Sequence, residues 1–92
     1  MIQQHKQKTL VALKKAATSL GKVIEMTENE KYCVDIIQQV LAVQGLLKSA
    51  QSTLLKNHFD CCFRDAFETK NKKRQDELVS ELLRVFEISQ KK

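Results

Sequence analysis

Apolar residues in the first part of the chain recur at helical spacing. They lie three or four residues apart, at Leu10, Leu13, Ala17, Leu20 and Ile24. This spacing predicts an amphipathic helix over residues 4–28. The remaining surface of that helix is strongly basic, since it carries Lys6, Lys8, Lys14, Lys15 and Lys22.

The middle of the chain predicts a second and much longer helix, over residues 30–68. Its apolar positions, from Val34 to Phe59, cover more than one side of a helix, and such a helix usually contacts several neighbours. Its length exceeds that of an ordinary globular helix, which indicates a coiled-coil-like or oligomeric setting. Residues 27–30 are the predicted turn before it, with Asn29 as the residue that caps its N-terminus.

A third helix is predicted over residues 74–89. Its apolar residues repeat at helical spacing, at Leu78, Val79, Leu82, Leu83 and Phe86. A polar and basic connector, residues 69–74, precedes it. The chain has no proline, only two glycines and no internal repeat. We therefore expect an all-α protein of three helices with a long central helix, forming a single domain over residues 1–92.

The size and composition of the chain restrict its class. Ninety-two residues lie near the lower end of what buries a self-sufficient core, so oligomerisation is expected to complete the fold. No apolar run approaches the ~18 residues of a membrane span, and no signal-peptide pattern opens the chain. We expect a cytoplasmic protein with no membrane partner, in which Cys33, Cys61 and Cys62 are reduced thiols. The sequence shows no pairing of a catalytic base with a nucleophile. We therefore expect neither an enzyme nor a small-molecule substrate.

Three side chains that bind soft metals are distributed in a distinctive way. His58 and Cys62 are four residues apart, so on a helix they share one face and can hold one metal ion. Cys33 lies 25 positions before His58. On one helix that separation is roughly 37 Å, because each residue rises ~1.5 Å. One chain could not then close the site, whereas two antiparallel copies could, with Cys33 of one copy meeting His58 and Cys62 of the other.

Such an antiparallel pair of helices must cross near residue 46. Gly45 lies beside that point, where the missing side chain would allow the two helices to approach closely. The alternative interpretation is that Gly45 merely destabilises the helix, by about 1 kcal/mol.

Short segments between residues 32 and 83 match a known family. They are Tyr32-Cys33-Val34-Asp35-Ile36, Val40-Leu41-Ala42-Val43-Gln44, Leu54-Leu55-Lys56-Asn57-His58, Cys62, and Ser80-Glu81-Leu82-Leu83. Through them the sequence resembles the CsoR/RcnR family of small all-helical metal-sensing repressors. The order Cys, His, Cys at this spacing is similar to the signature of the copper-sensing subset.

The resemblance implies a tetramer built as a dimer of three-helix dimers. It implies a Cu(I) site of Cys33 from one protomer with His58 and Cys62 from its partner, and Tyr32 and Glu81 match positions that surround the metal ligands in the family. Two thiolates and one imidazole suit Cu(I), a soft ion that accepts few ligands, whereas zinc normally takes a fourth. The function implied is a repressor that binds operator DNA in the apo form and releases it when Cu(I) binds.

The DNA-binding surface departs from the family pattern. Many members carry a Gly-Gln-Val-Arg-Gly-like segment in the first helix, where this chain has Thr18-Ser19-Leu20-Gly21-Lys22. Lys14, Lys15 and Lys48 match positions that are often basic, and with Lys22 they are the candidate DNA contacts. Lysine neutralises phosphates but lacks the bidentate geometry of arginine. The net charge of +5 permits an anionic partner without requiring one.

Three alternatives stay open at this stage. A cysteine-based persulfide or redox sensor would use the thiols alone, with Cys61 as an additional thiol beside the site. A copper-binding protein with weakened or lost DNA binding would fit the missing arginine of the first helix. A nickel or cobalt sensor would recruit an N-terminal histidine, for which His5 is the candidate, although a histidine near a terminus is more often simply solvated.

Overall fold

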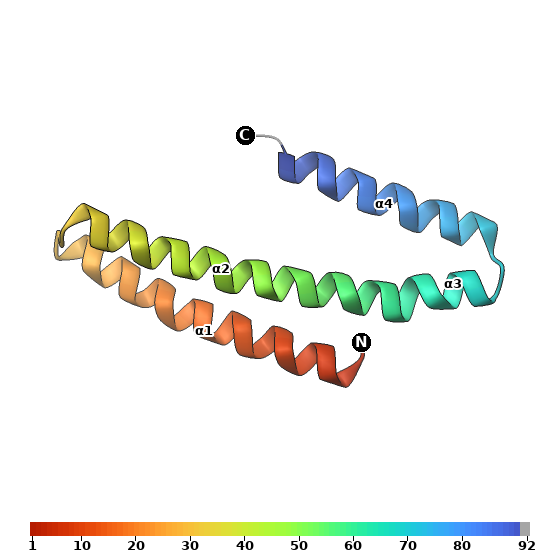
Figure 1. Cartoon of the computed structure of the whole chain (residues 1–92), viewed down its shortest axis with the longest axis horizontal. Coiled ribbons are helices and arrows are strands. Elements are labelled where there is room, and N and C mark those ends of the chain that lie inside the picture. The colour runs from red at the N-terminus through yellow and green to blue at the C-terminus, as the bar shows by residue number, and fades with distance from the viewer. Residues whose placement is uncertain (91–92) are drawn as a thin grey trace. The chain divides into compact units, whose positions relative to one another are not determined.

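The computed structural model describes residues 1–90, which are helical throughout apart from the N-terminal residues and two short turns. The elements are α1 (Gln3–Glu28), α2 (Cys33–His58), the π-helical turn η1 (Phe59–Phe63), α3 (Arg64–Glu68) and α4 (Lys72–Gln90) (Figure 1). Because α2, η1 and α3 follow one another without a break, the described chain has three helical segments and no strand, which confirms the all-α prediction with a long central helix. No described helix is long and apolar enough to cross a membrane.

The chain forms two compact units, of which the first is Met1–Lys56. In it α1 and α2 run antiparallel, side by side (Figure 1), around a core of Ala16, Val23 and Val43, with Ile36 and Leu46 packed against it. The stripe of larger residues in α1 is not this packing surface: Leu10, Leu13, Ala17, Leu20 and Ile24 are all exposed. Small side chains allow two helices to approach closely, and the larger apolar residues are left on the surface of the single chain.

The turn between α1 and α2 corrects the predicted start of the second helix. Asn29 does not cap α2 but ends α1, and the left-handed residue that follows is Glu30, with φ of 51°. The Lys31 N–H donates to the Met26 carbonyl at 3.0 Å, as in a Schellman motif. This motif uses residues 30–32 to reverse the chain, so α2 begins at Cys33 rather than at residue 30.

The second unit starts at Asn57 and contains η1, α3 and α4. Its core is the cluster of Phe63, Ala66 and Leu78, and Leu78 is fully buried. Cys62 and Leu82 pack against this cluster. The chain turns from α3 to α4 through a second left-handed residue, Lys70, with φ of 56°.

Asn71 is the N-terminal cap of α4, which begins two residues earlier than the sequence predicts. Its Oδ1 accepts a hydrogen bond from the Arg74 N–H at 3.1 Å. The first turn of α4 has no acidic residue to stabilise the helix dipole. We expect Asn71→Ala to lower the free energy of unfolding by about 1 kcal/mol, measured by urea denaturation. Asn71→Ser, which keeps a capping oxygen, should unfold like the wild type, and equal losses in both variants would contradict a capping role.

Candidate metal centre

The candidate ligands Cys33 and His58 are the first and last residues of one uninterrupted helix, α2. A helix of this length places its ends about 37 Å apart. Within residues 1–90, no three histidine, cysteine, aspartate or glutamate side chains come together as a metal site. The sequence predicts that one long helix carries Cys33 and His58, and α2 carries both.

Cys33 and Tyr32 lie together at the start of α2, and both are exposed. The Tyr32 carbonyl accepts hydrogen bonds from the N–H groups of Asp35 at 3.0 Å and Ile36 at 3.2 Å, which begins the helix. The Tyr32 side chain is 69% exposed. The thiol of Cys33 and the phenol of Tyr32 are therefore both accessible to a second molecule.

His58 is the last residue of α2, and Cys62 lies four residues further on, within η1. A π turn is wider than an α turn and is frequent at functional sites. Both Cys62 and Phe63 lie about one turn beyond His58, and the rings of His58 and Phe63 meet edge to face, with centroids 5.3 Å apart. His58 and Cys62 are half-buried. No glycine, proline or charge pattern in residues 59–63 predicts this turn or the His58–Phe63 contact that accompanies it.

Cys61 has a different environment from its neighbour Cys62. Its Sγ lies 3.7 Å from Oδ1 of Asn57, a buried residue, and the thiol donates a hydrogen bond to this amide oxygen. In this arrangement the Cys61 thiol has the Asn57 amide as its partner. All three cysteines are free of disulfides.

Glu81 lies on α4, where its carboxylate is 3.9 Å from the Arg74 guanidinium. Arg74 also pairs with Glu77 at 3.3 Å. These groups are about half exposed, and such surface ion pairs contribute little to stability. The family resemblance implies a place for Glu81 beside the metal ligands; in the structure its ionic partner is Arg74.

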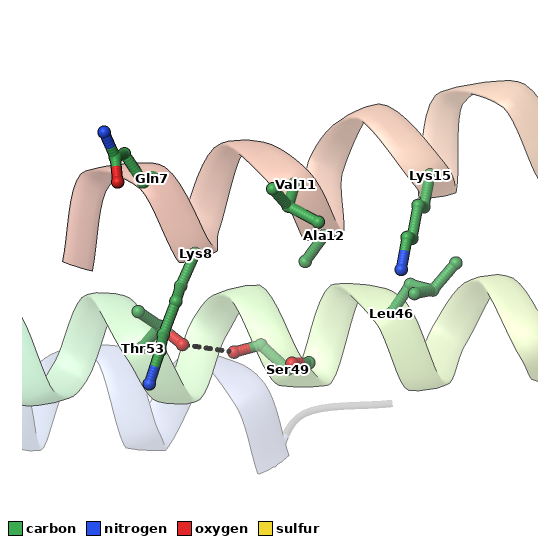
Figure 2. Close-up of a pocket in the computed structure, with 8 residues that line it drawn as sticks. All are labelled: Gln7, Lys8, Val11, Ala12, Lys15, Leu46, Ser49 and Thr53. Atoms are coloured by element: carbon green, nitrogen blue, oxygen red, sulfur yellow. Dashed lines mark hydrogen bonds between the residues drawn. The ribbon is translucent and has the colours of Figure 1, made fainter. Parts of the chain in front are cut away.

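The lysines predicted to contact DNA lie on the first unit. Lys8 and Lys15 extend from α1 toward α2 over a shallow groove with a volume of about 360 Å³ (Figure 2). Its lining is Gln7, Lys8, Val11, Ala12, Lys15, Leu46, Ser49 and Thr53. The Thr53 hydroxyl donates to the Ser49 carbonyl at 3.1 Å. The apolar residues of the lining thus lie between the cations Lys8 and Lys15, and α2 contributes the hydroxyl groups of Ser49 and Thr53.

A second hollow continues along the same helices. Lys14 and Lys15 line it together with Thr18, Ser19 and Leu46. Lys22 on α1 and Lys48 on α2 are exposed and lie outside both linings. Lys15 therefore lines both hollows, with Lys8 in the first and Lys14 in the second, whereas neither lining includes Lys22 or Lys48. His5 is half-buried near the start of α1, and its carbonyl accepts the Thr9 hydroxyl at 2.7 Å.

Comparison with known proteins gives a consistent result. Residues 5–87 match the model of a family described as metal-sensitive transcriptional repressors. The chain is 37% identical over 75 residues, 80% of its length, to the copper-sensing transcriptional repressor CsoR of Mycobacterium ulcerans (strain Agy99), and spans 64% of that protein. It is 36% identical over 74 residues, again 80% of its length, to CsoR of Bacillus subtilis (strain 168), and spans 70% of that protein.

A more distant relative is also named as a copper sensor. The copper-sensing transcriptional repressor RicR of Mycobacterium tuberculosis (strain ATCC 25618 / H37Rv) is 30% identical over 59 residues, which cover 64% of this chain and 62% of RicR. No solved structure matches the chain. The matches confirm the resemblance to the CsoR/RcnR family and to its copper-sensing members.

Proposed function

We propose that this chain, which belongs to the family of metal-sensitive transcriptional repressors, is a repressor that responds to Cu(I). In this proposal the apo protein binds operator DNA and the copper-loaded protein releases it. Two things support the proposal: the relatives are copper-sensing transcriptional repressors, and this chain has candidate metal ligands in Cys33, His58 and Cys62. The family is one of repressors, and we propose neither an enzymatic activity nor a small-molecule substrate for this member.

One observation carries the proposal: α2 has a candidate thiolate ligand, Cys33, at its first residue and a candidate imidazole ligand, His58, at its last. Cys62 lies one turn beyond. We propose that Cys33 of one copy joins His58 and Cys62 of a second, antiparallel copy. Two thiolates and one imidazole suit Cu(I), a soft ion that these three side chains would coordinate. The thiols release protons as they become ligands, and a reducing cytoplasm is the compartment that we propose.

A second copy would also cover apolar surface that the single chain exposes. The large residues of α1 face outward, and so do several on α2: Val34, Ile37, Val40, Leu41, Leu47 and Leu54. A small soluble domain rarely leaves this much large apolar side-chain surface uncovered unless it is an interaction site. We infer a homodimer through α2, and a pair of such dimers as the tetramer.

Gly45 provides a test of the crossing between the two copies of α2. A Cβ at Gly45 or Gly21 would meet no other atom within 4 Å in the single chain. In a helix with no neighbour at that position, replacing either glycine by alanine would raise the free energy of unfolding by about 1 kcal/mol. We expect Gly21→Ala to show this gain, and Gly45→Ala instead to weaken the dimer, measured by sedimentation over a range of concentrations. Equal stabilisation, with an unchanged dimer, would place Gly45 outside the crossing.

The lysine surface of the first unit is the part that we propose contacts DNA. Lys14, Lys15, Lys22 and Lys48 would neutralise phosphates, which positions the protein on DNA without specifying sequence.

Copper binding would link the Cys33 end of one α2 to the π turn of the other copy, with Tyr32 and Glu81 next to the ligands. Such a coupling is reciprocal, so DNA must weaken copper binding by the same factor by which copper weakens DNA binding.

The experiment that tests the function is a DNA-release assay. Labelled DNA from upstream of the protein's own gene is bound to the apo protein and followed by fluorescence anisotropy while Cu(I) is added without oxygen. We expect release at about one copper per chain, and no release from the Cys33→Ala protein. Release that persists in Cys33→Ala would refute the proposed copper mechanism.

A further inference from the structure

The ring of His58 packs against a buried aromatic ring. The centroids of His58 and Phe63 are 5.3 Å apart and the rings are almost perpendicular, at 87°. Aromatic pairs prefer this edge-to-face arrangement at such distances, because the positive edge of one ring meets the negative face of the other. The contact therefore favours one orientation of the His58 imidazole over others that a half-buried side chain could adopt.

Phe63 is itself held firmly. Only 7% of it is exposed, and it forms one cluster with Ala66 and the fully buried Leu78 of α4. Two further rings flank it, Phe59 with centroids at 4.7 Å and Phe67 at 6.1 Å. Both flanking rings are about half exposed. Phe63 is thus the buried centre of an aromatic column, and its position is set by the core of the second unit.

The contact depends on the π turn. His58 and Phe63 are five residues apart, the separation that a π turn connects by hydrogen bonding, whereas a regular α-helix aligns residues three or four apart. Cys62, the neighbour of Phe63, packs against the same core cluster. One core therefore supports both the imidazole of His58 and the thiol of Cys62.

We propose that Phe63 is a positioning residue for the metal site, which holds the His58 imidazole in the orientation used for ligation. The inference rests on the proposed copper function and adds to it. Holding a ligand in its bound geometry before the metal arrives lowers the ordering cost of binding. Supporting groups around metal-ligating histidines typically change affinity by 10–100-fold. Through Leu78, the same ring links the orientation of His58 to the packing of α4.

The test compares Phe63→Leu with Phe67→Leu. Leucine keeps apolar volume in the core and removes the aromatic ring, and Phe67 stacks on the same column from an exposed position. We expect Phe63→Leu to weaken Cu(I) binding about tenfold in a competition titration, at the low end of the 10–100-fold range because a ring contact and not a hydrogen bond is lost, with Phe67→Leu close to the wild type. In the apo protein, the NMR signals of the His58 ring protons should move in Phe63→Leu only, because they lose the ring current of Phe63.

Each outcome decides between roles. A Phe63→Leu protein that melts earlier but binds Cu(I) like the wild type, while His58→Ala has lost binding, would make Phe63 a core residue only and leave the copper function standing. Unchanged binding in His58→Ala would instead overturn the copper site itself. If Phe63→Leu does not fold, the wild-type apo protein decides: nuclear Overhauser contacts between the two rings support the inference, and their absence overturns it.

Discussion

Replacing Cys33, His58 or Cys62 by alanine is expected to lower the affinity for Cu(I) by about a thousandfold or more. The loss should exceed the 10–100-fold typical of groups that only support metal ligands. The reason is that each variant removes one of the three proposed ligands of Cu(I), and no fourth side chain is proposed to take the place of the lost ligand. The measurement is an anaerobic titration against a Cu(I) chelator, with the copper content per chain determined independently.

Cys61→Ala is the matched control for these variants. Its thiol is adjacent to Cys62 but donates to Asn57, so its removal should leave copper affinity within a few fold of the wild type. A large loss of copper affinity in Cys61→Ala, with little loss in Cys62→Ala, would show that Cys61 and not Cys62 is the ligand. Cys62 packs against the core, and thermal unfolding of Cys62→Ala without metal separates lost packing from lost ligation.

Replacing Lys14 and Lys15 together by glutamine is expected to produce the second large effect, on DNA binding by the apo protein. Each lysine that contacts a phosphate contributes about 0.9 to the slope of log affinity against log salt concentration. The double variant should therefore flatten this slope by roughly one unit for each contacting lysine in each bound chain, and weaken binding strongly at low salt. The measurement is fluorescence anisotropy with operator DNA over a range of salt concentrations.

A second pair of lysines controls for the change in net charge. Lys70 lies in the turn before α4 and Lys72 is the first residue of α4; both are exposed, as Lys14 and Lys15 are. The Lys70→Gln/Lys72→Gln protein carries the same charge as the first variant but should keep a slope close to that of the wild type. If the salt-dependence slope falls equally in both double variants, DNA binding depends on overall charge, and Lys14 and Lys15 have no special part in it.

Much of the fold follows from helical periodicity. The spacing predicts a first helix over residues 4–28 and a break after residue 68, and the structure has α1 at Gln3–Glu28 and the end of α3 at Glu68. The start of α2 was harder to predict, because Asn29 is a good capping residue and its position suggests an N-terminus. The actual turn depends on a left-handed backbone at Glu30, a residue type that gives no signal for this conformation.

Which side of α1 packs within the chain could not be read from residue size. The larger apolar residues Leu10 and Ile24 suggest the core, yet Ala16 and Val23 form it. A single sequence does not separate the surface that packs within one chain from the surface that packs between chains, because both are apolar. The wide apolar surface of α2 did indicate several neighbours, and part of it packs on α1 while the rest is exposed.

For the candidate site, the sequence predicts one long helix that carries Cys33, His58 and Cys62, and the constant rise per residue sets Cys33 and His58 roughly 37 Å apart along it. The sequence does not predict the π turn at Phe59–Phe63, because no residue type in that segment indicates one. The participation of all three side chains in one metal site stays a prediction from the sequence and the family.

The measurement that tests the shared copper site most directly is a mixing experiment with two inactive proteins. Cys33→Ala and the double variant His58→Ala/Cys62→Ala should each bind almost no Cu(I). When the two chains assort randomly into dimers, each mixed dimer regains one intact site, since every interface between two copies is used twice by symmetry. We predict about a quarter of the wild-type copper per chain in the mixture. A mixture that binds no more copper than its components would contradict a site shared between two chains.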